Sequence, residues 1–258
     1  MDAIVLAGGQ PTVEDPLYVL SSGKNKAMIP VGGRPMVQWV IDALCGSQRV
    51  EQLVLIGLQP GPLLQSSKPT AYIDEGDGML ANIKVGLEYF SLIRPASTHV
   101  LLVSCDIPAI TPEIVDWRIE NAIQADADLD YAVVRREVME ARFPASNRSY
   151  LRIRDGEYCG GDLNVLRIGL AKREALWEEL IKARKNVLHQ ASLLGWDLLL
   201  LALTRMLTLE NAERKVSSRL KLKGHATVSP YAELAMDADK PEQVAILDSD
   251  LSYRTGAA

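Results

Sequence analysis

Apolar residues along the first half of the chain form two alternating kinds of segment. Short unbroken apolar runs, typical of buried strands, alternate with stretches in which apolar residues recur every three or four positions, as in helices that face a core. Strands are expected at 3–7, 52–58, 70–73 and 99–103, and helices at 36–44, at 79–93 and after Thr111-Pro112, an N-cap followed by proline. These strand-then-helix units within residues 1–125 predict an α/β fold with a mostly parallel, Rossmann-like sheet flanked by helices.

The second half of the chain has a different pattern. A further strand is expected at 129–134, and the arginine-rich stretch at 135–154 predicts a loop and a hairpin. A glycine turn that leads into an apolar strand is expected within 158–165, and helical spacing from 172 to 218 predicts two or three helices. A short strand and loop at 226–236 then precede a closing helix that starts near Pro241. We expect residues 1–258 to form a single domain.

The composition is that of an ordinary soluble globular protein, with 48% hydrophobic and 24% charged residues among 258. A net charge of −5 gives no reason to expect nucleic-acid binding or a polybasic membrane anchor. The longest apolar stretch, 193–209, is interrupted by Asp197, Thr204 and Arg205, so no membrane span is expected. The three cysteines are widely spaced and form no C-x-x-C pair, and no signal peptide is recognisable. We therefore expect reduced thiols and a cytoplasmic protein.

The clearest chemistry lies in the first 36 residues. The opening strand breaks into Gly8-Gly9, Lys26 follows, and a helix starts near Met36. Glycines leave backbone N–H groups free to approach an anion, so this order of strand, glycine loop, lysine and helix predicts a phosphate-binding site. Neither the dinucleotide fingerprint nor the P-loop spacing occurs here, and a simple tight turn is the alternative interpretation of Gly8-Gly9.

These residues resemble the signature of the MobA-like nucleotidyltransferase family. Its LAGG motif is matched by Leu6, Ala7, Gly8 and Gly9, and its K-x-x-x-P-V-x-G-x-P motif by the segment from Lys26 to Pro35. The resemblance implies a fold like that of the nucleotide-diphospho-sugar transferases, with a helical C-terminal insertion at about 170–225. This chain differs from most relatives in its first loop, because residues 10–25 contain no arginine and Lys24 is the extra cation.

Asp106 is the strongest candidate for a metal ligand. It follows the strand at 99–103, at the edge where open α/β sheets bind ligands, and a carboxylate there suits Mg²⁺. The alternative is an aspartate that caps a turn. Cys105-Asp106-Ile107-Pro108 also resembles the C-D-x-P motif of the same family, in which this aspartate holds the metal.

A second acidic segment, 237–242, resembles the family's late D-x-D-x-P-E motif, which completes the metal shell. Asp239 is the first choice as ligand and Asp237 the second, because the spacing does not separate them. An acidic turn before a helix explains this segment equally well.

The resemblance also implies where the two substrates bind. It assigns the base and ribose to a set formed by Gly76, Asp77, Gly78 and Asn82. It assigns the acceptor to a loop formed by Gly160, Gly161, Asp162 and Asn164, for which a bulged start of a strand is an equally good explanation. The arginines of 135–154 could bind a phosphorylated acceptor, although the acidic residues among them favour a solvated surface. The run 196–203 is expected to be a packed helix, and could instead bury against a second subunit, as in a homodimer, or an apolar acceptor tail.

Together the resemblance implies a Mg²⁺-dependent nucleotidyltransferase that moves an NMP from an NTP to a small phosphorylated acceptor and releases pyrophosphate. Residues 1–125 would form the nucleotide-binding half and 126–258 the acceptor-binding half. Lys26 would neutralise charge on the phosphates, and Asp106 would hold the metal. Two alternatives remain: a glycosyltransferase that uses a nucleotide sugar, and a nucleotide-binding regulatory protein without catalysis.

Overall fold

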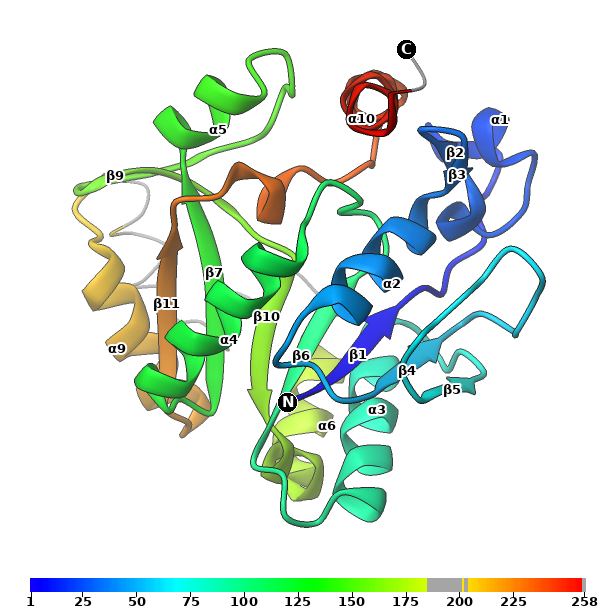
Figure 1. Ribbon diagram of the computed structural model, residues 1–258. Helices are drawn as coiled ribbons and strands as arrows, with labels where there is room; N and C mark the ends of the chain where they lie inside the picture. Colours follow the sequence, from blue (N-terminus) through cyan, green and yellow to red (C-terminus); the bar gives the residue numbers. More distant parts are fainter. Residues whose placement is uncertain (185–200, 202–203, 257–258) are drawn as a thin grey trace.

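A nine-stranded mixed sheet forms the centre of the part of the chain that the computed structural model describes, residues 1–184, 201 and 204–256 (Figure 1). One half of the sheet consists of parallel strands in the order β5 (Thr70–Ile73), β4 (Leu53–Ile56), β1 (Asp2–Leu6) and β6 (His99–Ser104). Parallel strands end at the same edge, so the loops that follow β1, β4 and β6 lie next to one another.

The other half of the sheet is not purely parallel. β10 (Leu163–Arg167) runs antiparallel between β6 and β7 (Leu129–Arg135), and β11 (Gly224–Ser229) pairs in parallel with β7. β9 (Gly156–Gly160) is antiparallel to β7 and forms the predicted hairpin with β8 (Leu151–Ile153). β9 and β10 both pair with β7. Residues 160–164 therefore lie where the chain passes from the end of β9 into β10.

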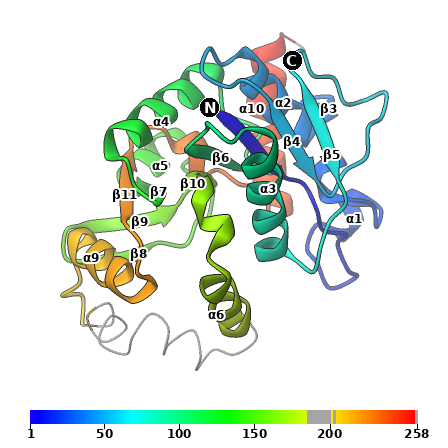
Figure 2. The ribbon, with the colours of Figure 1, turned by 90° about the horizontal axis from the view of Figure 1, so that it is seen from below.

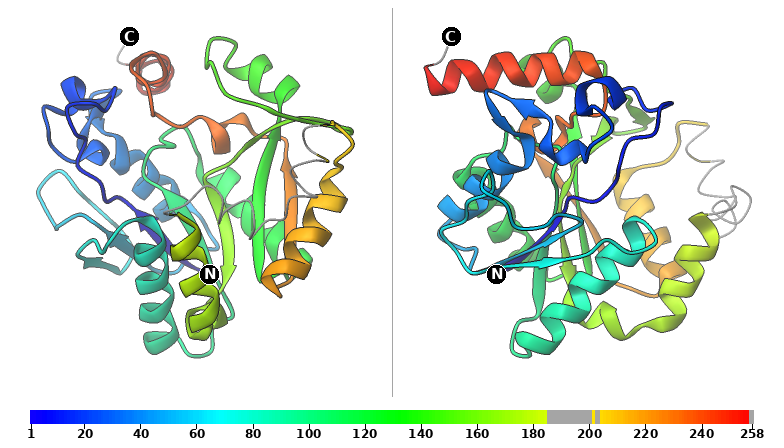
Figure 3. Two further views of the ribbon diagram at one scale, coloured as in Figure 1. Left: turned by 180° about the vertical axis from the view of Figure 1, so that it is seen from behind. Right: turned by 90° about the vertical axis from the view of Figure 1, so that its right-hand side faces the viewer.

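Helices cover both faces of the sheet (Figure 3). α2 (Met36–Gly46) and α4 (Pro112–Ala125) lie on one face, and α3 (Met79–Ile93), α6 (Glu174–Arg184) and α9 (Leu209–Leu220) on the other. Successive strand residues point to opposite faces, so Ala3 and Val5 of β1 join the core under α2 and α4 while Ile4 joins the core under α3. This two-sided burial explains why the central strands read as unbroken apolar runs.

The chain between β1 and α2 contains several short elements. These are α1 (Tyr18–Ser21), the 3₁₀ turn η1 (Lys26–Met28) and a small hairpin of β2 (Pro30–Val31) and β3 (Arg34–Pro35). Gly32 and Gly33 form the hairpin turn with φ of 57° and 75°, values that favour glycine. Lys26 thus lies at the start of η1, between α1 and the β2–β3 hairpin.

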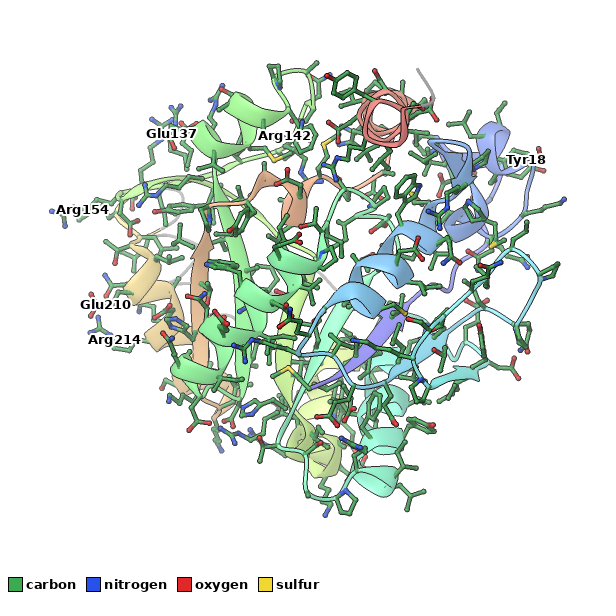
Figure 4. The ribbon with its side chains drawn as sticks, viewed as in Figure 1. Tyr18, Glu137, Arg142, Arg154, Glu210 and Arg214 are labelled. Carbon is green, nitrogen blue, oxygen red and sulfur yellow. The ribbon has the colours of Figure 1, made fainter. Side chains whose placement is uncertain are left out.

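The last described helix, α10 (Pro241–Thr255), is seen end-on in Figure 1, above the sheet and between α5 (Arg136–Arg142) and the β2–β3 hairpin. The Gly32 N–H donates to Asp248 Oδ1 at 2.8 Å, which ties α10 to the β2–β3 hairpin. On the opposite side, Arg142 of α5 reaches α10, where its Nη2 donates to Asp250 Oδ1 at 2.6 Å (Figure 4).

Several expectations from the sequence are confirmed to the residue. The strand 70–73, the helix 79–93 and the proline at the start of the closing helix are as predicted, and Thr111 Oγ1 accepts from the Ile114 N–H as an N-cap should. No helix of the described residues combines the length and apolar character needed to cross a membrane.

Two expectations differ from the structure or lie outside it. The sequence predicts loop and hairpin for the stretch 135–154, yet its first part is the helix α5, which buries Met139 and contains the good helix formers arginine, glutamate and alanine. In the helical region 172–218, α6 and α9 are present, followed after β11 by the 3₁₀ turn η3 (Ala232–Ala235). Apart from Leu201, the run 196–203 is outside the described residues.

Candidate active site

The loop after β1 is held closely against the loop after β4. Gly57 has a φ of 94°, and a Cβ there would lie 2.3 Å from the Gly8 Cα, so a side chain is excluded at this contact. The Asn25 Nδ2 donates to the carbonyl oxygens of Ala7 at 2.7 Å and Gly57 at 3.0 Å. Its Oδ1 accepts from the Ala27 N–H at 2.8 Å and so caps the turn that carries Lys26. Sequence reasoning missed Asn25, and its capping position beside Lys26 was the available signal.

Lys26 brings together the two acidic segments that the sequence singled out. Its Nζ lies 2.6 Å from Asp106 Oδ2 and 3.4 Å from Asp239 Oδ1. Asp106 is only 5% exposed, and its other carboxylate oxygen accepts from the Ser104 hydroxyl. The Ala238 N–H donates to the Asp106 carbonyl oxygen at 2.9 Å, which fixes the 237–239 segment beside the end of β6.

The charges in this cluster act on one another. Burial lowers the pKa of the Lys26 ammonium, but Asp106, with Cys105 and Asp239, raises it by more, so the net pKa lies above the ordinary value. Lys26 therefore stays charged at every physiological pH. Burial and the Asp106 charge raise the pKa of the neighbouring Cys105 thiol, which keeps it protonated and unsuited to act as a nucleophile.

Asp237 and Asp239 have different partners. Whereas Asp239 faces Lys26, Asp237 forms an ion pair with Arg148. Burial raises the pKa of Asp237 to about 6, against the opposing effect of Arg148. The structure thus distinguishes the two aspartates, which the spacing in the sequence does not. Asp239 shares the Lys26 ammonium with Asp106, and Asp237 does not.

Arg148 differs from the arginines around it in the sequence. Its side chain is 14% exposed and also donates from Nη2 to the Gly160 carbonyl at 3.4 Å. Arg136, by contrast, is half-exposed and pairs with Glu140 and Glu157, and Figure 4 shows Arg154 at the outer edge of the molecule. The sequence favours a solvated surface for the arginines of 135–154, and Arg136 fits this expectation. Arg148 does not fit it, and its partner Asp237 lies 89 positions away in the sequence.

The segment predicted to cradle the base lies beside the glycine loop. A Cβ on Gly8 would be 2.5 Å from Glu75 Oε2 and 3.2 Å from Asn82 Nδ2. The Gly9 N–H donates to Glu75 Oε2 at 2.8 Å, so this amide already binds an anionic group. Asn82 is buried, and its Oδ1 accepts from the Gly76 N–H at 2.7 Å, which shapes the turn before α3. Sequence reasoning missed Glu75, although it adjoins Gly76.

The remaining residues of the predicted nucleotide site are less central. Gly78 has a φ of 87° and precedes the first residue of α3, while Asp77 is exposed on the same turn. Lys24 is exposed on the first loop, two positions from Lys26. Their roles remain predictions.

The predicted acceptor loop passes close to β7. A Cβ on Gly160 would lie 2.2 Å from the Tyr131 hydroxyl oxygen, and one on Gly161 would lie 3.1 Å from the Ala132 Cβ. Asn164 uses both ends of its amide inside the protein, accepting from the Ala132 N–H at 2.8 Å and donating to the Gly161 carbonyl at 3.0 Å. These contacts shape the backbone of the loop.

Asp162 is the member of this loop that belongs electrostatically to the acidic cluster. Burial raises the pKa of its carboxyl to about 7, and the charges of Asp106 and Asp237 contribute to the rise. Asp162 is therefore close enough to sense both aspartates, which joins the predicted acceptor loop to the Lys26 cluster.

The carboxylates of this cluster are of the kind that bind magnesium. Among the described residues no group of three or more His, Cys, Asp or Glu side chains forms a ready metal site. Mg²⁺, however, is commonly held by one or two carboxylates together with substrate phosphates and water. Asp106 and Asp239, which both reach the Lys26 ammonium, fit that requirement.

Two solved structures with the same fold are named as transferases. A hypothetical transferase from Thermus thermophilus is 35% identical, with a TM-score of 0.81 over 94% of this chain and 98% of its own. A 2-C-methyl-D-erythritol 4-phosphate cytidylyltransferase, also from Thermus thermophilus, is 14% identical, with a TM-score of 0.55 over 97% of this chain and 99% of its own, and shares the fold alone. These likenesses confirm the predicted fold of the nucleotide-diphospho-sugar transferases.

The sequence itself is similar to curated guanylyltransferases. The molybdenum cofactor guanylyltransferase of Yersinia pestis (strain Pestoides F) is 30% identical over 126 residues, which are 47% of this chain and 57% of the relative. The chain therefore spans about half the length of the curated relatives it matches. The sequence profile of the MobA-like NTP transferase domain matches a longer stretch, residues 3–218. The chain belongs to the MobA-like NTP transferase family, as the two N-terminal motifs predicted.

Proposed function

We propose that the protein transfers a nucleoside monophosphate from an NTP to a small phosphorylated acceptor and releases pyrophosphate. The observation that carries this proposal is the meeting of Lys26, Asp106 and Asp239 at the ends of the parallel strands, beside the Gly8-Gly9 loop. Membership of the family supports it, as does the similarity to proteins named guanylyltransferase.

In the proposed reaction an acceptor phosphate oxygen attacks the α-phosphorus of the NTP. A new P–O bond forms, the bond from the α-phosphorus to the α–β bridging oxygen breaks, and its electron pair leaves with pyrophosphate. A phosphate monoester is already deprotonated at neutral pH, so the nucleophile needs no general base. Catalysis then depends on positioning and on stabilising charge.

The protein's own groups suit these two tasks. The Lys26 ammonium would stabilise charge that develops on the transferred phosphoryl oxygens, and the Gly9 N–H, which donates to a carboxylate in this structure, would donate to a phosphate. Asp106 and Asp239 would hold Mg²⁺, which when bound neutralises and orients the phosphates. Arg148, a buried guanidinium beside Asp237, would bind the acceptor phosphate.

Pyrophosphate release tests the proposal. Each NTP is supplied with Mg²⁺ and a panel of phosphate monoesters, and the protein is compared with its Lys26→Ala and Asp106→Ala variants. We expect either substitution to lower turnover by about 10²-fold or more, as the loss of a transition-state charge partner does elsewhere. Lys172→Ala removes an exposed lysine far along the chain and serves as the matched control.

Two results would contradict the proposal. Folded Lys26→Ala and Asp106→Ala variants with full turnover would exclude the proposed roles. Turnover of a nucleotide sugar in place of an NTP would instead favour a glycosyltransferase.

A further inference from the structure

A large apolar cavity lies on the α3 side of the sheet. Its volume is about 360 Å³, within the ~300–1,000 Å³ common for small-molecule sites. Its walls come from the sheet and from α3, α6 and the end of α9, which Figures 2 and 3 show on one side of the sheet. The described side chains that line its apolar part include Ile83, Leu102, Leu166, Trp177 and Leu180.

One end of this cavity belongs to the candidate active site. Leu6 of the LAGG motif, Ser104 and Asp162 all line it. Ser104 donates its hydroxyl to Asp106, and the Asp106 charge acts on the Asp162 carboxyl, so these lining residues adjoin the Lys26 cluster. The cavity is therefore continuous with the place proposed for phosphoryl transfer.

Among the described residues, few polar groups line the rest of the cavity, and they belong to Tyr131, Asn164 and Trp177. The Trp177 Nε1–H is already used, donating to the Leu170 carbonyl at 2.9 Å, which leaves the indole to present an apolar surface. Asn164 also lines the cavity, but both ends of its amide bond to the backbone. With so few polar groups among the described lining residues, a base, a ribose or a sugar would replace few of its hydrogen bonds to water here, whereas a hydrocarbon would lose none.

We propose that this cavity receives the apolar body of the acceptor, so that the acceptor is a phosphate monoester of a hydrophobic alcohol. This inference rests on the proposed function, because it places the acceptor's phosphate at the Lys26 cluster and its hydrocarbon beneath α3 and α6. The polar end and the apolar interior thus match the two ends of one amphiphilic molecule.

Chain length of the acceptor is the variable to test. Butyl phosphate and octyl phosphate, each below its critical micelle concentration, carry the same head group. Each buried methylene is worth about fourfold in affinity, from ~0.8 kcal/mol per CH₂. We expect calorimetry with the full chain to show at least tenfold tighter binding of octyl phosphate, and pyrophosphate release with NTP to favour it in the same order.

Cavity-filling variants locate the effect. Leu102→Trp fills the cavity from β6 and Leu180→Trp from α6, and each should remove most of the preference for octyl over butyl phosphate. Ile181→Trp is the matched control, because Ile181 follows Leu180 on α6, is exposed and does not line the cavity. Circular dichroism of each variant establishes that it is folded.

The outcomes separate this inference from the proposed function. Equal binding of both phosphates by a protein that still binds Mg–NTP and releases pyrophosphate would overturn the apolar acceptor and leave the nucleotidyltransferase intact. An octyl preference that persists in Leu102→Trp and Leu180→Trp would place the hydrocarbon elsewhere and also overturn the inference. A protein that binds no NTP at all would overturn the proposed function itself.

Discussion

At the scale of single residues, the site is defined by a cluster of negative charge. Asp106 and Asp237 are buried, Asp162 is partly buried and Asp239 is exposed; the four influence one another, Lys26 pairs with Asp106 and Asp239, and Arg148 pairs with Asp237. Bringing like charges together raises the free energy of the folded state unless cations compensate. A site of this kind is suited to receive a divalent cation together with the phosphates it accompanies.

Replacing Lys26 with methionine should destabilise the protein as well as impair catalysis. The Asp106 carboxylate, buried at 5% exposure, would lose its cationic partner. Breaking such a buried pair costs about 3 kcal/mol, and because the Lys26 pKa is raised the stabilisation should be fully present at both pH 6 and pH 8, which lie below the ordinary pKa of lysine. Urea unfolding at pH 6 and pH 8 measures it, with Lys172→Met as control. An unchanged unfolding free energy would show that the pair contributes nothing net.

Asp162 should make stability depend on pH. Its pKa of about 7 in the folded protein exceeds the ordinary 3.8, so between these values the folded state binds more protons than the unfolded chain and stability falls as pH rises. Asp162→Asn removes this dependence. At 1.36 kcal/mol per pKa unit, the variant should gain up to about 4 kcal/mol over the parent at pH 8 and little at pH 4.

Urea unfolding at both pH values checks this expectation. Glu14→Gln, which removes an exposed carboxylate, is the control. If the difference in stability between Asp162→Asn and the parent is the same at both pH values, the raised pKa of Asp162 is contradicted.

At the scale of elements, the sequence predicts the strands and helices that depend on residues close together in the chain. The apolar run 52–58 and the helical spacing of 79–93 indicate β4 (Leu53–Ile56) and α3, because burial and helical period both depend on residues close together in the sequence. The positions of Lys26 and Asp106 in loops after strands were also predictable, since parallel strands share an edge.

Contacts between distant segments were not predictable in this way. The sequence favours a solvated surface for Arg148 and its neighbours, and only the fold shows the pairing of Arg148 with Asp237. Asn25 and Glu75 were missed because their partners, Gly57 and Gly9, are more than 30 positions away. The helix α5 was missed because its short length gave too few apolar positions to show a period.

The first loop should depend on Asn25 for its geometry. Asn25→Ala removes three hydrogen bonds that join the loop to β1, β4 and η1, and leaves the Ala7 and Gly57 carbonyls without that donor. At about 1 kcal/mol per bond we expect NTP affinity to fall by about tenfold or more. Calorimetric titration with Mg–NTP measures it. Asn121→Ala, which removes an asparagine bonded within α4, should leave affinity unchanged.

At the scale of the whole molecule, α10 is the element that joins the two halves. Val244, Leu247 and Leu251 pack into the core under α2 and α4, and the helix contacts both the β2–β3 hairpin and α5. Its first turn follows directly on Asp239. The position of the late acidic segment therefore depends on the packing of this helix.

Leu251→Ala should lower the unfolding free energy by about 3 kcal/mol. Leu251 is fully buried against the Gly32 turn, so truncation leaves a cavity that the glycines cannot fill. Leu92→Ala, at a site 82% exposed on α3, should change stability by less than about 0.5 kcal/mol. Equal effects of the two substitutions in urea unfolding would contradict the role given to α10.

The long separation of Lys26 from Asp239 has a consequence for synthesis. The lysine leaves the ribosome 213 residues ahead of the aspartate that faces it. Strands β1, β4 and β6 can pair early, but Asp239, the third member of the cluster, is made only after β11, and the helix that follows it, α10, is made and docks later still. A growing chain can thus form most of the scaffold and still lack the complete set of charges, so nascent fragments should not consume nucleotide during translation.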